Sequence, residues 1–228
     1  MARKSNNNES LSYIKEVGKD SLENEWLKLC FESMKYAKKY CFGKNVNTIN
    51  VYERNFIISM AYELGMKRAN NANDACMVGG EVGKSIYDDF FRRSHNDKVH
   101  DTMKGLGMKE TYVFPDFIVH KSNDIESVSE ENQIMIIEAK TKKNLTKKEF
   151  GRDFLKLNLY IDRLKFQEAV YLIVNQTPQQ IDACIKNYIG KGYYMSEQNL
   201  DKLWFFIQDG HNEDPVIYKC EQSMIYRK

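Results

Sequence analysis

The sequence predicts an α/β protein in which a central mixed sheet is flanked by helices, with an N-terminal helical extension. Two apolar runs, at 134–137 and 169–174, have the length and composition of strands buried on both faces. Between them, residues 147–164 repeat apolar side chains at helical spacing. A further helix at 178–189 and a strand at 203–207 continue the alternation, which favours parallel strands joined by right-handed crossovers.

Composition indicates a single globular domain over 20–228, preceded by a flexible polar tail at 1–19. Hydrophobic residues make up 42% of the 228 residues, and only three are proline. The helical part spans about 20–100 and the α/β core about 108–228. No stretch reaches the roughly 18 to 20 apolar residues of a membrane span, so we expect a soluble cytoplasmic protein without a membrane partner.

Charge and cysteine content narrow the function classes. The formal net charge is only +2, so a nucleic acid would have to bind to local basic patches. The five cysteines are scattered and lack zinc-ligand spacing, which argues against both a disulfide framework and a structural zinc. Histidines 95, 100 and 120 have no evident catalytic partner in the sequence.

The first part of the chain contains two predicted helices. The first begins near Asp20, where Asp20 and Glu23 have capping-box spacing, and the second spans about 51–68. In the second helix Glu53 lies on the inward face, three residues before Phe56. The same glutamate has capping-box spacing from Asn50, so it serves either a buried site or the helix end.

A loop at 70–83 and a short helix at 85–93 are expected next. Within them, Gly79 to Ser85 resembles a phosphate loop only superficially. The pattern requires glycine five residues before the Gly-Lys pair, and Val78 occupies that position. We therefore do not expect an NTPase.

Two anomalies in the strand region point to chemistry. Pro115 interrupts the extended segments 111–114 and 117–120, and the buried strand at 134–137 ends in Glu138-Ala139-Lys140. Because strand side chains alternate, Glu138 and Lys140 point to one face. A hairpin through the polar loop 121–133 would place Asp116 beside Glu138, and two adjacent carboxylates favour a hard cation such as Mg²⁺. Alternatively, Asp116 is a turn residue and the other two are ordinary charges at a strand end.

Pro115-Asp116 and Glu138-Ala139-Lys140, with 138 − 116 = 22, resemble the signature of the PD-(D/E)xK superfamily of nucleases over about 50–175. The resemblance implies a restriction-endonuclease-like core and a Mg²⁺-dependent endonuclease in which Mn²⁺ can substitute. Asp116, Glu138 and the Ala139 carbonyl would bind the metal, and Lys140 would assist the nucleophile. Glu53 matches the acidic residue on the preceding helix that often joins the metal site in relatives, so it is a fourth, further candidate for catalysis and metal binding.

The helix that Thr146 and Glu149 are expected to cap would supply further polar groups, as it does in relatives. Asp153, Lys156 and Tyr160 occupy this region, with Lys156 in place of the glutamine of the Gln-x-x-x-Tyr pattern. A basic cluster beside the site would contact backbone phosphates, or else form a solvated loop. The candidate nucleic-acid-binding residues are Lys156 and Tyr160 of this helix, together with Lys142, Lys143, Lys147, Lys148, Arg152, Arg92 and Arg93.

Two functions follow as hypotheses. The first is a metal-dependent nuclease, with DNA expected before RNA as the substrate. A homodimer would serve double-strand cleavage, because one such site cuts one strand at a time. The second is a catalytically silent binding or assembly module of the same fold, within a defence or mobile-element complex.

Overall fold

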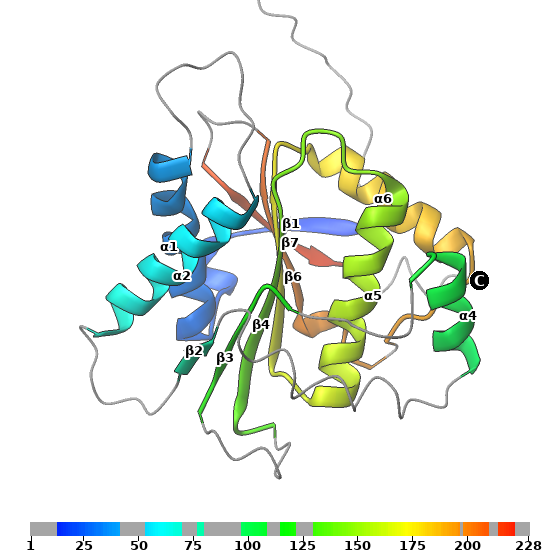
Figure 1. The fold of residues 1–228 in the computed structure, drawn as a ribbon, viewed down its shortest axis with the longest axis horizontal. Helices are drawn as coiled ribbons and strands as arrows, with labels where there is room; N and C mark the ends of the chain where they lie inside the picture. The colour runs from blue at the N-terminus through cyan, green and yellow to red at the C-terminus, as the bar shows by residue number, and fades with distance from the viewer. Residues whose placement is uncertain are drawn as a thin grey trace, which may run out of the picture.

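We describe a computed structural model of the chain over residues 13–41, 53–69, 77–79, 97–108, 115–121, 130–196, 198–209 and 214–221. Within these ranges one seven-stranded mixed sheet has the order β1-β7-β6-β5-β4-β3-β2 (Figure 1). The strands are β1 (Ile14–Val17), β2 (Met77–Gly79), β3 (Phe117–His120), β4 (Gln133–Lys140), β5 (Glu168–Val174), β6 (Leu203–Gln208) and β7 (Val216–Cys220).

The centre of the sheet has the parallel arrangement that the sequence predicts. Strands β4, β5 and β6 pair in parallel, and the helices α5 (Lys147–Leu164) and α6 (Pro178–Gly190) connect them. Strands β3 and β4 form an antiparallel hairpin with Phe117 opposite Ile137. The central strands are buried on both faces, which explains their continuous apolar runs.

Helices cover both faces of the sheet. Helices α1 (Glu25–Cys41) and α2 (Glu53–Ala69) lie on one side, and α5, α6 and α4 (Asp97–Gly105) lie on the other (Figure 1). Alternate residues of β4 separate the two cores: Ile136 packs in the α5 layer, whereas Ile137 and Ala139 pack in the α1–α2 layer. No helix in the described part of the chain is long and apolar enough to cross a membrane.

Side-chain caps fix where the helices begin. At α5 the predicted capping box is present: Thr146 Oγ1 accepts from the Glu149 backbone N–H, and the Glu149 carboxylate accepts from the Thr146 N–H. Helix α1 begins at Glu25 and not near Asp20, because Asn24 Oδ1 accepts from the Trp26 N–H at 2.8 Å. Residues 19–21 form a separate 3₁₀ turn.

Several short elements differ from the prediction. Strand β1 lies within the segment expected to be a polar tail, β2 lies within the expected loop 70–83, and β7 was not expected. Helix α4, which carries His100, was not expected either. Helices α1 and α2 form a complete layer of the fold and not an extension of it. The predicted helix at 85–93 and strand at 111–114 lie outside the described residues.

Candidate functional site

The β3–β4 hairpin brings Asp116 to the end of β4. Continuing the register beyond Phe117 and Ile137 places Asp116 opposite Glu138. The Asp116 N–H donates to the Ile137 carbonyl at 3.1 Å, and its Oδ2 accepts from the Ala139 N–H at 2.7 Å. Pro115 precedes this ladder, where its missing N–H leaves no hydrogen bond unmade. Burial raises the pKa of Asp116, against the opposing effects of the Ala139 N–H and of two nearby lysines.

Glu138 is the most deeply buried acid of the site, with only 1% of its surface exposed. Its Oε2 lies 2.5 Å from Lys156 Nζ of helix α5. Its Oε1 is buried and has no hydrogen-bond partner among the described residues. Burial raises the pKa of Glu138 well above its ordinary value, although the Lys156 ammonium opposes this shift. An unsatisfied carboxylate oxygen in such a place is costly unless a ligand or a proton completes it.

Lys140 faces the same layer as Glu138, as the strand alternation predicts, and contacts two other acids. Its Nζ lies 2.9 Å from Glu53 Oε1 at the start of α2 and 3.4 Å from Asp153 Oδ2 of α5. Burial lowers the pKa of Lys140, but Asp153 and Glu53 outweigh this effect, so the net shift is upward. Glu53 is therefore an ion-pair partner of Lys140, an interaction across 87 residues of sequence.

Asp153 connects the two lysines. Besides Lys140, it pairs through Oδ1 with Lys156 Nζ at 2.9 Å and accepts from the Tyr171 hydroxyl at 3.0 Å. Tyr171 lies on β5, so this single carboxylate joins α5 to both β4 and β5. Burial, followed by the nearby Asp153 charge, raises the pKa of Tyr171 well above its ordinary value, which keeps its hydroxyl a donor.

These side chains form one connected group, which we call the acid–lysine cluster. Its members are Glu53, Asp116, Glu138, Lys140, Asp153 and Lys156. When all six are ionised, four carboxylates contribute −4 and two ammonium groups +2, so the cluster carries −2. An excess of negative charge in a cluster whose centre is buried favours a cation or bound protons.

The cluster has donors that suit a hard divalent ion, but its acids are not gathered around an empty centre. Within the described ranges, no three His, Cys, Asp or Glu side chains are grouped so that they could hold a metal ion. Ammonium groups lie between the acids instead, with Lys156 joining Glu138 to Asp153. The unpartnered Glu138 oxygen and the neighbouring Asp116 carboxylate fit the oxygen donors that Mg²⁺ prefers.

The basic segment after β4 is held in place by amides that follow β5. Asn175 Nδ2 donates to the Thr141 carbonyl at 3.0 Å, and Gln176 Nε2 donates to the carbonyls of Lys142 and Lys143 at 2.7 and 2.8 Å. Asn175 adopts a left-handed backbone with φ of 65°. Sequence reasoning missed both amides, because nothing in their local pattern distinguishes them from ordinary turn residues.

The side chains of this segment differ in how far they are engaged. Lys142 pairs with Glu149 at 2.6 Å, and this contact together with the Thr146 N–H lowers the pKa of Glu149 to about 2. The remaining lysines of the segment are exposed on the surface: Lys143, Lys147 and Lys148. They remain candidates for phosphate contact.

Three of the predicted nucleic-acid contacts are engaged within the fold. Tyr160 is fully buried in the α5 layer, so its ring cannot contact a nucleic acid. Lys156 is occupied within the acid–lysine cluster. Arg152 caps helix α4, donating to the carbonyls of Leu106 at 2.9 Å and Gly107 at 3.3 Å. Two other candidates, at positions 92 and 93, lie outside the described residues.

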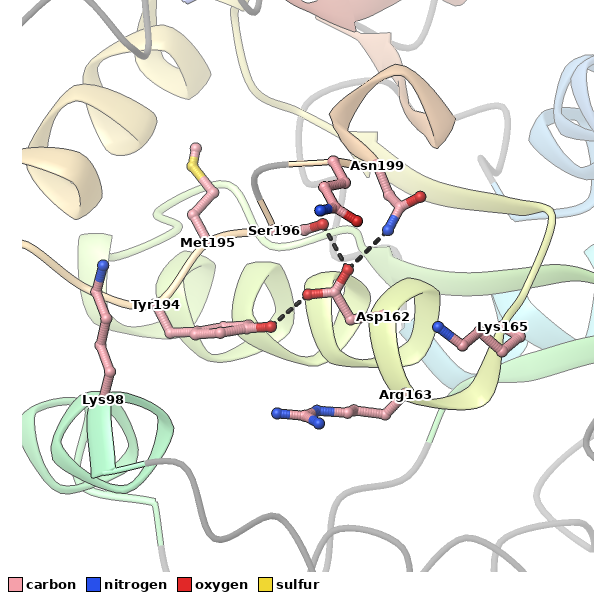
Figure 2. A pocket seen from close by; sticks show the side chains of 9 residues that line it. Lys98, Asp162, Arg163, Lys165, Tyr194, Met195, Ser196 and Asn199 are labelled. Atoms are coloured by element: carbon pink, nitrogen blue, oxygen red, sulfur yellow. Dashed lines mark hydrogen bonds between the residues drawn. The ribbon is translucent and has the colours of Figure 1, made fainter.

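A separate pocket of about 410 Å³ lies at the C-terminal end of α5 (Figure 2). Lys98, Arg163 and Lys165 contribute positive charge to its lining. At its centre Asp162 accepts from Ser196 Oγ at 2.5 Å, from Asn199 Nδ2 at 2.9 Å and from the Tyr194 hydroxyl. It shares no residue with the acid–lysine cluster, and the sequence analysis did not single it out.

Comparison of the chain with protein-family models, with curated proteins and with solved structures finds no match. The α/β fold class therefore stands on the architecture itself, and the function has to be argued from the geometry of the site.

Proposed function

We propose that this protein is a Mg²⁺-dependent nuclease of the PD-(D/E)xK, restriction-endonuclease-like type, which hydrolyses phosphodiester bonds in DNA. The proposal depends on one observation. Asp116, Glu138 and Lys140, from two strands of a hairpin, meet at one end of the sheet in a buried cluster with excess negative charge. The order of elements also agrees with the resemblance, since a helix bearing an acid precedes the hairpin and a helix with polar residues follows it.

Asp116, Glu138 and the Ala139 carbonyl are the groups that would bind the metal. When bound, Mg²⁺ supplies charge stabilisation for the phosphate and lowers the pKa of a coordinated water. The chain itself contributes carboxylates that are largely buried and therefore poorly hydrated. The Oε1 of Glu138 is available to a cation, because it is buried and no donor in the described structure satisfies it.

Lys140 acts in this proposal as a fixed cationic donor. Glu53 and Asp153 hold its ammonium group from two sides, and its raised pKa keeps it protonated at neutral pH. Its role in the proposal is therefore that of a donor and not that of a general base. It can orient a water molecule or stabilise charge on the scissile phosphate. Glu53 contributes by positioning Lys140.

The exposed lysines at 143, 147 and 148 would contact the substrate backbone, which predicts that binding weakens as salt concentration rises. Because one such site cuts one strand at a time, two copies of the chain are proposed to act together on a duplex. DNA is preferred over RNA in the proposal, and parallel digestion of both polymers decides between them.

Cleavage assays test the proposal directly. Plasmid, linear duplex, single-stranded DNA and RNA are incubated with the wild type in EDTA, Mg²⁺ or Mn²⁺. We expect metal-dependent cutting that falls by about 10² to 10⁴-fold in Asp116→Asn, Glu138→Gln and Lys140→Met, the range typical for loss of a catalytic group. Asp201→Asn and Lys186→Met are matched controls, because both residues are exposed and distant in sequence from the cluster. Cutting that persists in all three site variants rejects the assignment.

One observation favours the second candidate, a catalytically silent binding module. The ammonium groups of Lys140 and Lys156 already pair with three of the four acids, so the cluster also makes sense as a structural ion-pair network. This candidate predicts binding of nucleic acid or protein without metal-dependent turnover. Calorimetric titration with Mn²⁺ separates the two, since a competent site binds the ion and loses it in Glu138→Gln.

A further inference from the structure

We propose that Lys156 is a built-in competitor of the metal ion: its ammonium group occupies one oxygen of Glu138 and must withdraw to Asp153 before a divalent ion can engage the whole carboxylate. The inference rests on the proposed function, because it concerns how the same site is regulated. Lys156 would then act on the metal site and not as a substrate contact.

The contact between Lys156 and Glu138 is close and shielded from water. Their charged atoms lie 2.5 Å apart, and the side chains are 13% and 1% exposed. This charge-assisted hydrogen bond uses a lone pair of the carboxylate oxygen. A metal ion bound to the same oxygen would need that lone pair. Glu138 thus presents one occupied oxygen and one unpartnered oxygen. A divalent ion that engages the whole carboxylate has to displace the ammonium group.

The displaced ammonium group would keep a counter-charge. Lys156 Nζ is already 2.9 Å from Asp153 Oδ1, a contact between residues one helical turn apart. Asp153 is itself held by the Tyr171 hydroxyl, so it stays in place when Lys156 moves. Withdrawal therefore breaks one ion pair and keeps the other, without leaving a buried cation alone.

Lys140 provides an internal comparison. It carries the same charge within the same cluster, but its ion pairs are with Glu53 and Asp153. Removing either lysine makes the cluster more negative by one unit. Only removal of Lys156 also vacates the contact with Glu138. A difference between the two variants therefore measures occupancy of the site and not charge alone.

Mn²⁺ binding, measured by calorimetry without any substrate, tests the inference. We expect Lys156→Met to bind Mn²⁺ about tenfold more tightly than the wild type, because a nearby like charge that competes for the same carboxylate is removed and such charges alter cation affinity by about tenfold or more. Lys140→Met should show a clearly smaller gain. Equal or weaker binding by Lys156→Met, or an equal gain in both variants, overturns the inference.

Lys156→Gln covers the case in which Lys156→Met does not fold. Its amide can still donate a hydrogen bond to Glu138 but carries no charge, and we expect it too to bind Mn²⁺ more tightly than the wild type. Unchanged or weaker binding in this variant counts against the inference.

Cleavage measured on the same proteins separates the two proposals. Tighter binding in Lys156→Met without cutting by the wild type rejects the nuclease and supports the competitor. Metal-dependent cutting by the wild type, with unchanged Mn²⁺ affinity in Lys156→Met, supports the nuclease and rejects the competitor. Absence of Mn²⁺ binding in the wild type and in every variant rejects the metal site and the competitor with it.

Discussion

Helix α5 carries two aspartates that occupy opposite kinds of environment. Asp162 accepts from a serine, an asparagine and a tyrosine, all of them neutral donors (Figure 2). Asp153 instead lies between two ammonium groups, in a cluster where acids outnumber lysines and Glu138 keeps an unpartnered oxygen. The hydrogen bonds around Asp162 need no further partner. The cluster around Asp153 retains an unpartnered oxygen and excess negative charge, and a ligand that satisfies such a buried group gains most by binding.

The largest effect should come from breaking the incomplete cluster in metal-free buffer. Lys156→Ala leaves Glu138 without its ion-pair partner, and we expect a loss of about 3 to 5 kcal/mol in the free energy of unfolding. Asp162→Ala leaves only neutral donors unsatisfied, so we expect about 1 to 3 kcal/mol. Urea denaturation measures both. A loss for Asp162→Ala that equals or exceeds the loss for Lys156→Ala would remove the distinction between the two regions.

A smaller effect should distinguish the regions by their response to metal. At a Mg²⁺ concentration of about 100 times the dissociation constant, binding stabilises the folded state by about 2.7 kcal/mol. We expect thermal unfolding to shift upward with Mg²⁺ in the wild type and in Asp162→Asn. Glu138→Gln should lose the shift, because it removes a charged ligand of the proposed site. The same Mg²⁺ response in Glu138→Gln as in the wild type would place the ion elsewhere.

The smallest effect concerns a third carboxylate, Glu168 at the start of β5, which has a single neutral donor in Trp204 Nε1 at 2.7 Å. Burial raises its pKa to about 7, although the Trp204 contact opposes the shift. The folded state therefore holds a proton that the unfolded chain has lost. The contribution of this proton to stability is complete below pH 4.5 and disappears as the pH rises through about 7.

Glu168→Gln removes this titration and keeps an oxygen that can accept from Trp204. We expect the variant to match the wild type near pH 4 and to exceed it by about 1 kcal/mol at pH 8, a modest value because Glu168 is partly exposed. Denaturation curves across this pH range provide the measurement. A difference between the two proteins that does not change with pH contradicts the assignment.

The predictability of the fold from sequence followed the strength of the local pattern. The parallel strands and α5 were predicted correctly, because long buried runs and a Thr146–Glu149 capping box are local signals. Strands β1 and β2 have only four and three residues, and β1 pairs with β7 at the opposite end of the sequence. Pairing across such separations is decided by tertiary packing, which no sequence window contains.

In the candidate site, too, some features could be predicted from local sequence patterns, whereas others depend on tertiary packing. The approach of Asp116 to Glu138 follows from strand alternation and a hairpin, both visible in the sequence. The part played by Lys156 does not, because it depends on how α5 packs over β4. Its spacing from Asp153 was visible as a possible pair, but exposed helices carry such pairs routinely. Tyr160 was misplaced for a related reason, since a polar tip on a helix does not show whether its ring is buried.

The amide contacts from Asn175 and Gln176 have a consequence for any molecule that meets the loop after β4. Because these side chains already fix three consecutive carbonyls, the loop loses little conformational entropy when it contacts a ligand. Its lysine side chains can still adjust, whereas its backbone is preorganised in one shape. We therefore expect this loop to bind partners that have a regular, repeating structure in preference to partners that require its backbone to change conformation.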